Sequence, residues 1–250
     1  MLHPRAHGRL VFRRPFSILA GDASSLSFLY RVVGRGTAML AALEPGDPVD
    51  CLAPLGRGFP PPTLDTPPAL ILAGGVGLPP LHAWFARYGR PEDLACFGGR
   101  DPGDVPWSLL PEPWQVSVDQ AGEAPPPRPV HHGRVTELGL ALLADRSLPK
   151  PAAAAARAGP DGGRLVLACG PTPLLRAAAE LAAKRDWPCL VSLEEHMGCG
   201  YGVCKGCVVP LRDSGPAGWR NVNSCTEGPV LAAADLDWER FGAHHTGGSA

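Results

Sequence analysis

Apolar and polar residues follow different patterns in successive parts of this chain of 250 residues. Between residues 9 and 53, short apolar runs are separated by glycine and proline turns, which is typical of β-strands. The predicted strands are LVF at 10–12, SLSFLYRVV at 25–33 and PVDCLAP at 48–54. The proline-rich stretch PLGRGFPPPTLDTPP follows and is expected to be a linker.

The middle of the chain, residues 69–190, alternates apolar runs with amphipathic helical segments. Strands are predicted at 69–75, 93–99, 114–119 and 164–170, and helices at 79–89, 135–145 and 173–186. Alternation of strands and helices predicts a parallel α/β sheet. The alanine-rich stretch 148–163 has low complexity and is expected to be a solvated insertion.

The last part of the chain carries four closely spaced cysteines, Cys199, Cys204, Cys207 and Cys225. The spacing C-x4-C-x2-C, with a fourth cysteine further on, is the plant-type ferredoxin arrangement for a [2Fe–2S] cluster. Glycines at 198, 200, 202 and 206 let the backbone turn sharply and point amides at the sulfur atoms. The alternatives are a structural zinc site, which more often has two C-x2-C pairs, and disulfides, for which no secretory context is visible.

Charge and composition exclude several classes of function. The net charge is −1 and 19% of the residues are charged, so no basic surface for nucleic acid or anionic membranes is expected. The longest apolar runs are broken by glycine and proline and are too short to cross a bilayer. The sequence therefore predicts a cytoplasmic protein with no nucleic-acid or membrane partner.

A short motif near the start, Arg14-Pro15-Phe16-Ser17, is expected on a strand. It resembles the Arg-x-aromatic-Ser pattern with which ferredoxin reductase-type flavoproteins hold FAD, where the arginine neutralises the pyrophosphate and the serine lies near the flavin. Leu29-Tyr30-Arg31 end the next predicted strand, and Gly36-Thr37 open a predicted helix whose amides suit a pyrophosphate. The alternative is that Thr37 is an ordinary N-cap.

Two turns follow buried strands in the α/β region. Gly74, Gly75 and Gly77 lie between a predicted strand and helix, and Cys169-Gly170-Pro171 follow another strand. Nucleotides approach the backbone at such strand ends in open α/β sheets. The glycine turn is not a G-x-G-x-x-G fingerprint, and Cys169 alone has the alternative of a small buried hydrophobic residue.

Other residues carry weaker signals. Cys51, Cys96 and Cys189 lie in apolar strands and are expected to be buried core thiols. Arg100 follows a predicted strand, where it could meet the 2′-phosphate of NADP, although a surface arginine is the simpler interpretation. The sequence therefore leaves the choice between NAD and NADP open.

Seven segments, taken in order, resemble the electron-transfer subunit of dihydroorotate dehydrogenase B. They are RRPFS, LYRVVGRGT, LGRGF, GGVGLPPL, CGPTPLL, SLEEHMGCGYGVCKGC and SCTEGPV, spread over about residues 10–231. The family implies a ferredoxin reductase-like fold of α/β plus β class. It comprises an antiparallel FAD-binding β-barrel at 1–64, a parallel α/β NAD-binding domain at 65–190 and a [2Fe–2S] module at 191–250. The barrel is expected to be truncated, because family members carry a further N-terminal stretch before the Arg-Pro-x-Ser strand.

The resemblance also implies cofactors and a partner. The expected cofactors are FAD, held by the three N-terminal motifs, the [2Fe–2S] cluster, held by the four cysteines, and NAD. The expected partner is an FMN-containing catalytic subunit that oxidises dihydroorotate to orotate in pyrimidine biosynthesis, in a heterotetramer of two plus two. No residue set in this chain resembles a catalytic site for dihydroorotate. The alternatives are an NAD(P)H reductase subunit for an oxygenase, hydrogenase or sulfur-metabolising enzyme, and a non-catalytic redox or zinc-binding regulator.

Overall fold

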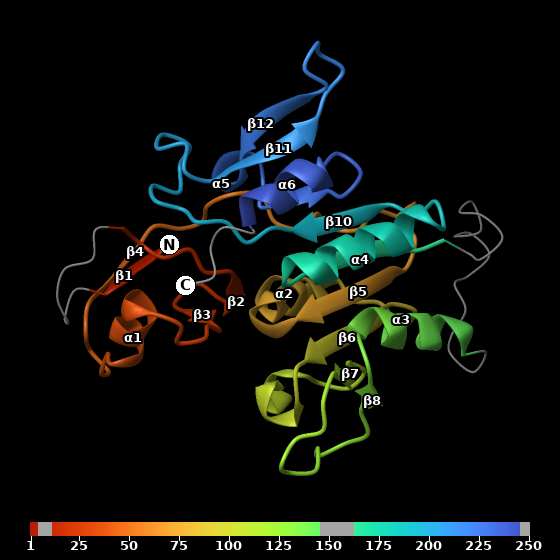
Figure 1. The fold of residues 1–250 in the computed structure, drawn as a ribbon. Coiled ribbons are helices and arrows are strands. Elements are labelled where there is room, and N and C mark those ends of the chain that lie inside the picture. Colours follow the sequence, from red (N-terminus) through yellow and green to blue (C-terminus); the bar gives the residue numbers. More distant parts are fainter. Residues whose placement is uncertain (5–11, 146–162, 246–250) are drawn as a thin grey trace. The chain divides into compact units, whose positions relative to one another are not determined.

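The protein folds into two compact units (Figure 1). The structure is a computed structural model that describes residues 1–4, 12–145 and 163–245. The first unit combines residues 1–58, 193–231 and 235–250, and the second comprises residues 59–192 and 232–234. The predicted strand at 10–12 and the predicted insertion at 148–163 lie almost entirely outside the described residues.

A parallel sheet forms the centre of the second unit. Its strands are β5 (Ala69–Gly74), β6 (Leu94–Gly99), β7 (Gln115–Val118), β8 (His131–His132), β9 (Leu165–Cys169) and β10 (Cys189–Ser192). They lie in the order β10-β9-β5-β6-β7-β8, and β13 (Val230–Ala232), whose last residue belongs to this unit, extends the sheet beyond β10. Each neighbouring pair from β10 to β8 is parallel. The predicted parallel α/β sheet is confirmed.

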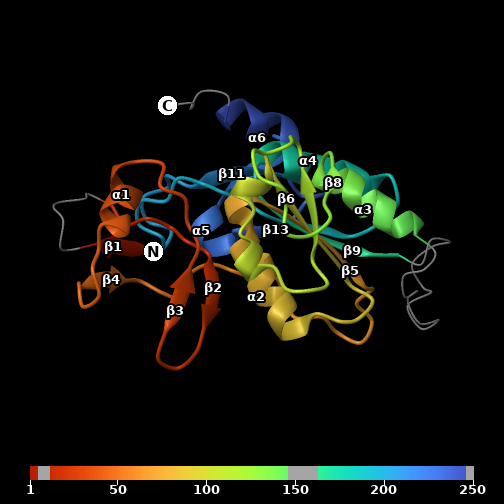
Figure 2. The same cartoon turned by 90° about the horizontal axis from the view of Figure 1, so that it is seen from below.

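Helices cover both faces of this sheet (Figure 2). They are α2 (Leu78–Tyr88), α3 (Val135–Ala144) and α4 (Thr172–Ala183), with short 3₁₀ helices η1 (Gly75–Gly77), η2 (Pro102–Asp104) and η3 (Trp107–Leu109). Helix α2 lies on one face, and α3 and α4 lie together on the other. Because both faces are covered, Leu70, Ile71 and Leu72 of β5 are all fully buried, and this central strand shows no alternation of apolar and polar residues.

A buried carboxylate holds the amino-terminal ends of the strands. The Asp93 carboxylate accepts the backbone N–H of Ala69 at 2.6 Å and that of Arg90 at 2.8 Å. It also pairs with the Arg90 guanidinium at 3.2 Å. Since Asp93 is 3% exposed, these donors replace the water that the charge loses on folding. The network joins the start of β5 to the turn before β6.

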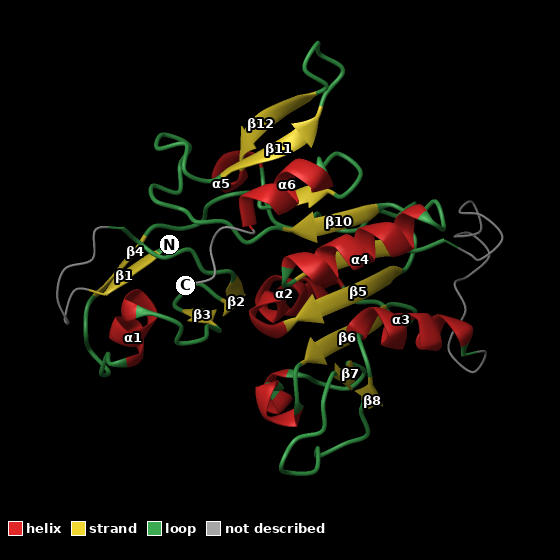
Figure 3. Cartoon of the chain, viewed as in Figure 1, coloured by secondary structure: helices red, strands yellow, loops and turns green. Residues whose placement is uncertain are grey.

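The first unit is built from both ends of the chain (Figure 3). Its elements are β1 (Leu2–Pro4), β2 (Ile18–Gly21), β3 (Leu26–Phe28), α1 (Arg35–Ala41), β4 (Val49–Cys51), β11 (Val208–Arg212), β12 (Trp219–Asn223), α5 (Ser224–Glu227) and α6 (Trp238–His245). The antiparallel pairs are β1 with β4, β2 with β3 and β11 with β12. A bridge between Arg57 and Pro229 connects the N-terminal and C-terminal segments.

One predicted strand is shorter than expected. Only Leu26–Phe28 of the predicted segment 25–33 is a strand, and the rest is irregular. Val32 is 55% exposed and Val33 is 78% exposed, and within the described part of the chain no strand pairs with them. An apolar run of high β-propensity forms a strand only where a neighbouring strand accepts its hydrogen bonds.

The division into a FAD-binding domain at 1–64, an NAD-binding domain at 65–190 and a [2Fe–2S] module at 191–250 stays a prediction. By contacts, the N-terminal and C-terminal segments belong to one unit. None of the described helices is long and apolar enough to cross a membrane.

Candidate functional site

The four predicted cluster cysteines come together in the first unit as two pairs. The backbone N–H of Cys204 donates to Cys199 Sγ at 3.5 Å, and the two thiols also contact each other. The thiols of Cys207 and Cys225 form the second contacting pair. Cys207 immediately precedes β11 and Cys225 lies in α5, whose first N–H, from Ser224, donates to the Cys207 carbonyl at 2.8 Å. A loop and a helix separated in sequence therefore supply one sulfur-lined site.

Backbone amides favour a thiolate on one side of this site. The N–H groups of Cys204, Tyr201 and Val203 point at Cys199 and lower the pKa of its thiol to about 6, because they stabilise the charged form. Burial and the neighbouring Cys207 thiol instead raise the pKa of Cys225 to about 11. A positively charged metal centre at this site would stabilise the thiolate form of Cys225 and so offset the raised pKa.

Two glycines of the loop lie beside a cluster thiol, and a third has a backbone conformation that favours glycine. A β-carbon at Gly198 would lie 3.4 Å from Cys204 Sγ, and one at Gly206 would lie 3.6 Å from it. Gly202 has a φ of +85° and faces Thr226 of α5. This backbone conformation favours glycine. Glycine at position 202 therefore lets the loop adopt the turn that it makes between the cysteines.

The arrangement fits the predicted cluster. A structural zinc ion takes four ligands around one point, whereas each iron of a [2Fe–2S] cluster takes two thiolates. The charge of Cys199 also acts on Cys225, so the two thiol pairs lie close to each other. The two thiol pairs match the needs of two irons. The assignment of the four cysteines as ligands stays a prediction, now with a geometric basis.

The three predicted FAD motifs meet in the first unit. The side chain of Arg14 lies against Gly36, since a β-carbon at Gly36 would come within 2.6 Å of Arg14 Nε. The ring of Phe16 packs against that of Tyr30 at 5.4 Å. The predicted motifs around Arg14, Leu29-Tyr30-Arg31 and Gly36-Thr37 are therefore close together, as a shared cofactor site requires, and their contact with FAD stays a prediction.

Local details of these motifs differ from the expectation. Pro15, Phe16 and Ser17 precede β2 and are not in a strand, and Leu29-Tyr30-Arg31 follow β3. Helix α1 begins at Arg35 with Gly34 as its N-cap, so Thr37 is not the N-cap. Its hydroxyl instead accepts the N–H groups of Val33 at 2.9 Å and Gly34 at 3.1 Å, which supports the turn that leads into the helix.

The two predicted nucleotide turns are in direct contact in the second unit. A β-carbon at Gly77 would collide with the Cys169 carbonyl group and the Gly170 nitrogen. A β-carbon at Gly170, whose φ is +150°, would lie 3.0 Å from the Gly74 carbonyl oxygen. The glycines therefore let the two turns pack directly against each other at the carboxyl ends of β5 and β9.

The topology makes this contact a switch point. From β5 the chain passes through α2 to β6 on one side, and from β9 it passes through α4 to β10 on the other. The connections diverge between β5 and β9, and ligands of open α/β sheets bind in the crevice at such a point. Gly74, Gly75, Gly77 and Cys169-Gly170-Pro171 all lie there, which fits their predicted role in NAD binding.

Two of the three other predicted core thiols are buried, and one is exposed. Cys96 and Cys189 are buried, and burial raises the pKa of each to about 12. Cys51 is exposed, so its prediction as a core thiol is wrong. It lies in β4, a strand whose residues alternate between exposed and half-buried, and the apolar flanks of the sequence did not reveal this.

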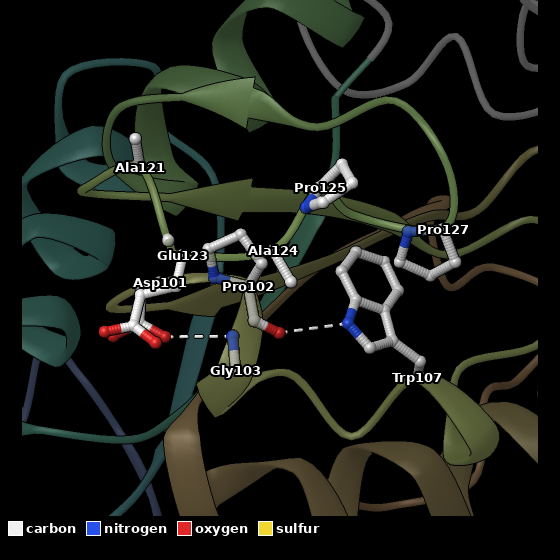
Figure 4. Close-up of a pocket in the computed structure, with 10 residues that line it drawn as sticks. Asp101, Pro102, Gly103, Trp107, Ala121, Glu123, Ala124, Pro125 and Pro127 are labelled. Atoms are coloured by element: carbon white, nitrogen blue, oxygen red, sulfur yellow. Dashed lines mark hydrogen bonds between the residues drawn. The ribbon is translucent and has the colours of Figure 1, made fainter.

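Sequence reasoning missed the cavity beyond β6 and β7 (Figure 4). Its acidic residues Asp101 and Glu123 stand in loops rich in glycine and proline that follow two predicted strands. The rule that ligands gather at the carboxyl ends of parallel strands points to these loops as well.

Comparison with known proteins agrees with this arrangement. The sequence model for the iron-sulfur cluster binding domain of dihydroorotate dehydrogenase B matches residues 194–237, which include all four cysteines. A solved structure described as an NADH-dependent reduced ferredoxin-NADP oxidoreductase superposes with a TM-score of 0.71 at 20% identity, covering 97% of this chain and 80% of that one. The predicted ferredoxin reductase-like fold is confirmed.

Relatives of known name extend over nearly the whole chain. Those from Geobacillus thermodenitrificans and Listeria monocytogenes are 33% and 31% identical, over 90% and 94% of this chain and 80% and 85% of theirs. The relative from Bacillus caldolyticus is 32% identical over 90% of this chain and 80% of its own. All three are named dihydroorotate dehydrogenase B (NAD(+)), electron transfer subunit. The chain therefore belongs to the family of dihydroorotate dehydrogenase B electron transfer subunits.

Proposed function

We propose that this chain is an oxidoreductase subunit that transfers electrons between NAD and an FMN-containing partner that oxidises dihydroorotate to orotate. The observation that carries the proposal is that the glycine-containing loop and α5 bring together two contacting thiol pairs, inside the segment that matches the family's cluster domain. When bound, FAD and the cluster supply the conversion between hydride exchange with NAD and single-electron exchange with the partner. The chain supplies binding, orientation and charge.

The cluster loop offers a contact surface for the partner. Cys207 and Cys225 are buried, whereas Cys204 is exposed. Beside it, Tyr201 is 58% exposed and Val203 is 71% exposed. Exposed apolar side chains next to an exposed cluster cysteine favour close approach of a second protein to that edge of the cluster. We infer that the partner's catalytic subunit docks over this loop.

Contacts within the first unit support a common scaffold for the two redox groups. A β-carbon at Gly198 would meet Phe12 at 3.6 Å, and Gly200 packs against Met1 and Leu55. The loop that carries Cys199 therefore rests on the N-terminal segment that also carries Arg14. We infer that FAD and the cluster are bound by one compact unit. The heterotetramer of two plus two and the cytoplasmic location stay predictions.

The division of labour between this chain and its partner gives a direct test. The purified chain, loaded with FAD and its cluster, is expected to pass electrons from NADH to an artificial acceptor. It is expected to show no dihydroorotate oxidation until the FMN-bearing partner is added, after which dihydroorotate reduces NAD. The measurement is NADH absorbance with and without the partner. Dihydroorotate turnover by this chain alone, or no coupling with the partner, contradicts the proposal.

Arg14 provides a test of the FAD site. Arg14→Ala removes a charge-assisted contact with the pyrophosphate, worth about 1.5–3 kcal/mol. FAD affinity is then expected to fall by roughly one to two decades, measured by titrating the flavin-free protein and following flavin fluorescence. Arg57→Ala, at an exposed arginine of the same unit, is the matched control. Equal FAD affinities in the two variants show that Arg14 does not contact the pyrophosphate.

A further inference from the structure

A buried serine lies between two of the predicted cluster cysteines. Ser224 is the first residue of α5 and is followed directly by Cys225. Its backbone N–H donates to the Cys207 carbonyl at 2.8 Å. Ser224 is therefore joined to one member of this thiol pair by the chain and to the other by a backbone hydrogen bond.

The register of β11 and β12 places the side chain of Ser224 on the same face as that of Cys207. Val208 lies opposite Asn223 in this antiparallel ladder, so the next pair beyond the strand ends is Cys207 with Ser224. The hydrogen bond from the Ser224 N–H continues the ladder through this pair. Directly opposite residues of an antiparallel pair point to the same face, with their β-carbons about 4.5–5.5 Å apart. The hydroxyl of Ser224 and the thiol of Cys207 therefore lie on one face of the hairpin.

The surroundings of Ser224 on this face are buried and apolar. Ser224 is 0% exposed, and the nearest pair on the same face, Val209 and Val222, is 0% and 1% exposed. Within the part of the chain that the structure describes, Ser224 Oγ has no hydrogen-bond partner. A buried hydroxyl without a partner has lost its hydrogen bonds to water with no compensation, and native proteins seldom leave one so. An acceptor from outside the chain is therefore expected here.

A cluster held by the four cysteines offers such an acceptor. Its sulfur atoms carry negative charge, and hydrogen bonds to them tune the reduction potential of an iron-sulfur centre. Backbone N–H groups of the loop already point at the sulfur of Cys199, and that of Gly202 points at the sulfur of Cys225. The hydroxyl of Ser224 adds a side-chain donor beside Cys207.

We propose that the Ser224 hydroxyl donates a hydrogen bond to a sulfur atom of the cluster and thereby raises its reduction potential. One-electron reduction adds negative charge to the cluster, so a donor stabilises the reduced form more than the oxidised form. The equilibrium between the two forms therefore depends on this residue. The inference rests on the cluster assignment of the proposed function, and it adds a tuning residue that is not a ligand.

Redox titration of the FAD-loaded and cluster-loaded protein tests the proposal. In Ser224→Ala, the equilibrium constant for one-electron reduction of the cluster is expected to fall about tenfold, which lowers the midpoint potential by about 59 mV. The midpoint is measured by EPR of the reduced cluster in samples poised at a series of potentials. Ser224→Thr keeps the hydroxyl group and is expected to show less than half of that shift.

Ser117→Ala is the matched control. Ser117 is 1% exposed, and its hydroxyl likewise has no partner among the described residues. It lies in β7 of the second unit, whereas the four cysteines belong to the first. Removal of this hydroxyl is expected to leave the midpoint potential of the cluster unchanged.

The proton of the hydrogen bond gives a second readout. Hyperfine spectroscopy of the reduced cluster in H₂O and in D₂O detects exchangeable protons close to the paramagnetic centre. The wild type and Ser224→Thr are expected to show one exchangeable proton that Ser224→Ala lacks. A purely structural role of Ser224 would not remove such a proton.

The outcomes separate this inference from the proposed function. A midpoint in Ser224→Ala equal to that of the wild type, or equal shifts in Ser224→Ala and Ser224→Thr, overturns the role of the hydroxyl and leaves the electron-transfer function intact. Loss of the cluster from Ser224→Ala, measured as iron and sulfide content, shows that the residue supports the fold around α5 and overturns its tuning role. A wild type without iron and sulfide contradicts the cluster assignment itself, and this inference with it.

Discussion

Replacing Cys204 by serine is expected to remove the iron-sulfur cluster, leave FAD bound and abolish electron transfer to the partner. Cys204 forms one thiol pair with Cys199, so its loss leaves one iron with a single protein thiolate. Changes to outer-shell groups alone cost about 10–100-fold in metal affinity or activity, and loss of a ligand is expected to exceed that range. Coupled reduction of NAD by dihydroorotate should therefore fall by at least about 100-fold.

The measurement combines composition with two activities. Iron and acid-labile sulfide are determined in anaerobically prepared protein, and NADH oxidation is followed with an acceptor that takes electrons directly from the flavin. That activity is expected to survive in Cys204→Ser. Cys51→Ser, which removes an exposed thiol of the same unit, is the control and should retain both the cluster and the coupled reaction.

Two results contradict the cluster prediction. Stoichiometric zinc without sulfide in the wild type shows that the cysteines form a structural zinc site. Coupled turnover that persists in a cluster-free Cys204→Ser variant removes the cluster from the electron path, even if the wild type contains iron and sulfide.

Replacing Asp93 by alanine is expected to destabilise the second unit by about 3–5 kcal/mol, which is the usual cost of removing one partner of a buried ion pair. The Asp93 side chain is fully buried in its pair with Arg90, and it also accepts the Ala69 and Arg90 amides. The substitution leaves these buried donors without their acceptor, and a buried donor that loses its partner costs free energy of its own.

Urea denaturation followed by tryptophan fluorescence and circular dichroism measures the loss, as a lower midpoint at an unchanged slope. Asp93→Asn keeps one acceptor oxygen and is expected to lose less stability than Asp93→Ala. Asp65→Ala, at an exposed aspartate in the linker, is expected to change stability by less than about 0.5 kcal/mol. A loss below about 1 kcal/mol in Asp93→Ala shows that the network at the strand ends contributes little.

The sequence alone determined the features that depend on short stretches of chain. Three cluster cysteines lie within nine residues, from Cys199 to Cys207, so their spacing and the glycines between them predict a sulfur-lined loop without any tertiary information. The alternation of strands and helices in residues 69–190 is likewise encoded locally, and it correctly predicted a parallel sheet. Order in sequence and similarity of motifs also identified the family.

Features that depend on neighbours were predicted less well. The apolar run 25–33 has high β-propensity throughout, but its second half lacks a pairing strand among the described residues. Cys51 has apolar flanking residues and is nevertheless exposed. Thr37 supports the preceding turn rather than capping the helix. Intrinsic propensity indicates which conformations and environments suit a residue. In each of these cases, contacts with neighbouring segments determined which one the residue adopts.

Only the tertiary structure decided which distant segments form each site. Cys225 reaches Cys207 because α5 packs under the loop, and β9 pairs with β5 although the two strands are far apart in the sequence. That pairing brings the two nucleotide turns into contact and creates the switch point beside which the cavity beyond β6 and β7 opens. Hydrogen bonds between strands and burial of apolar surface select one such arrangement for the whole chain, and no local pattern records that selection.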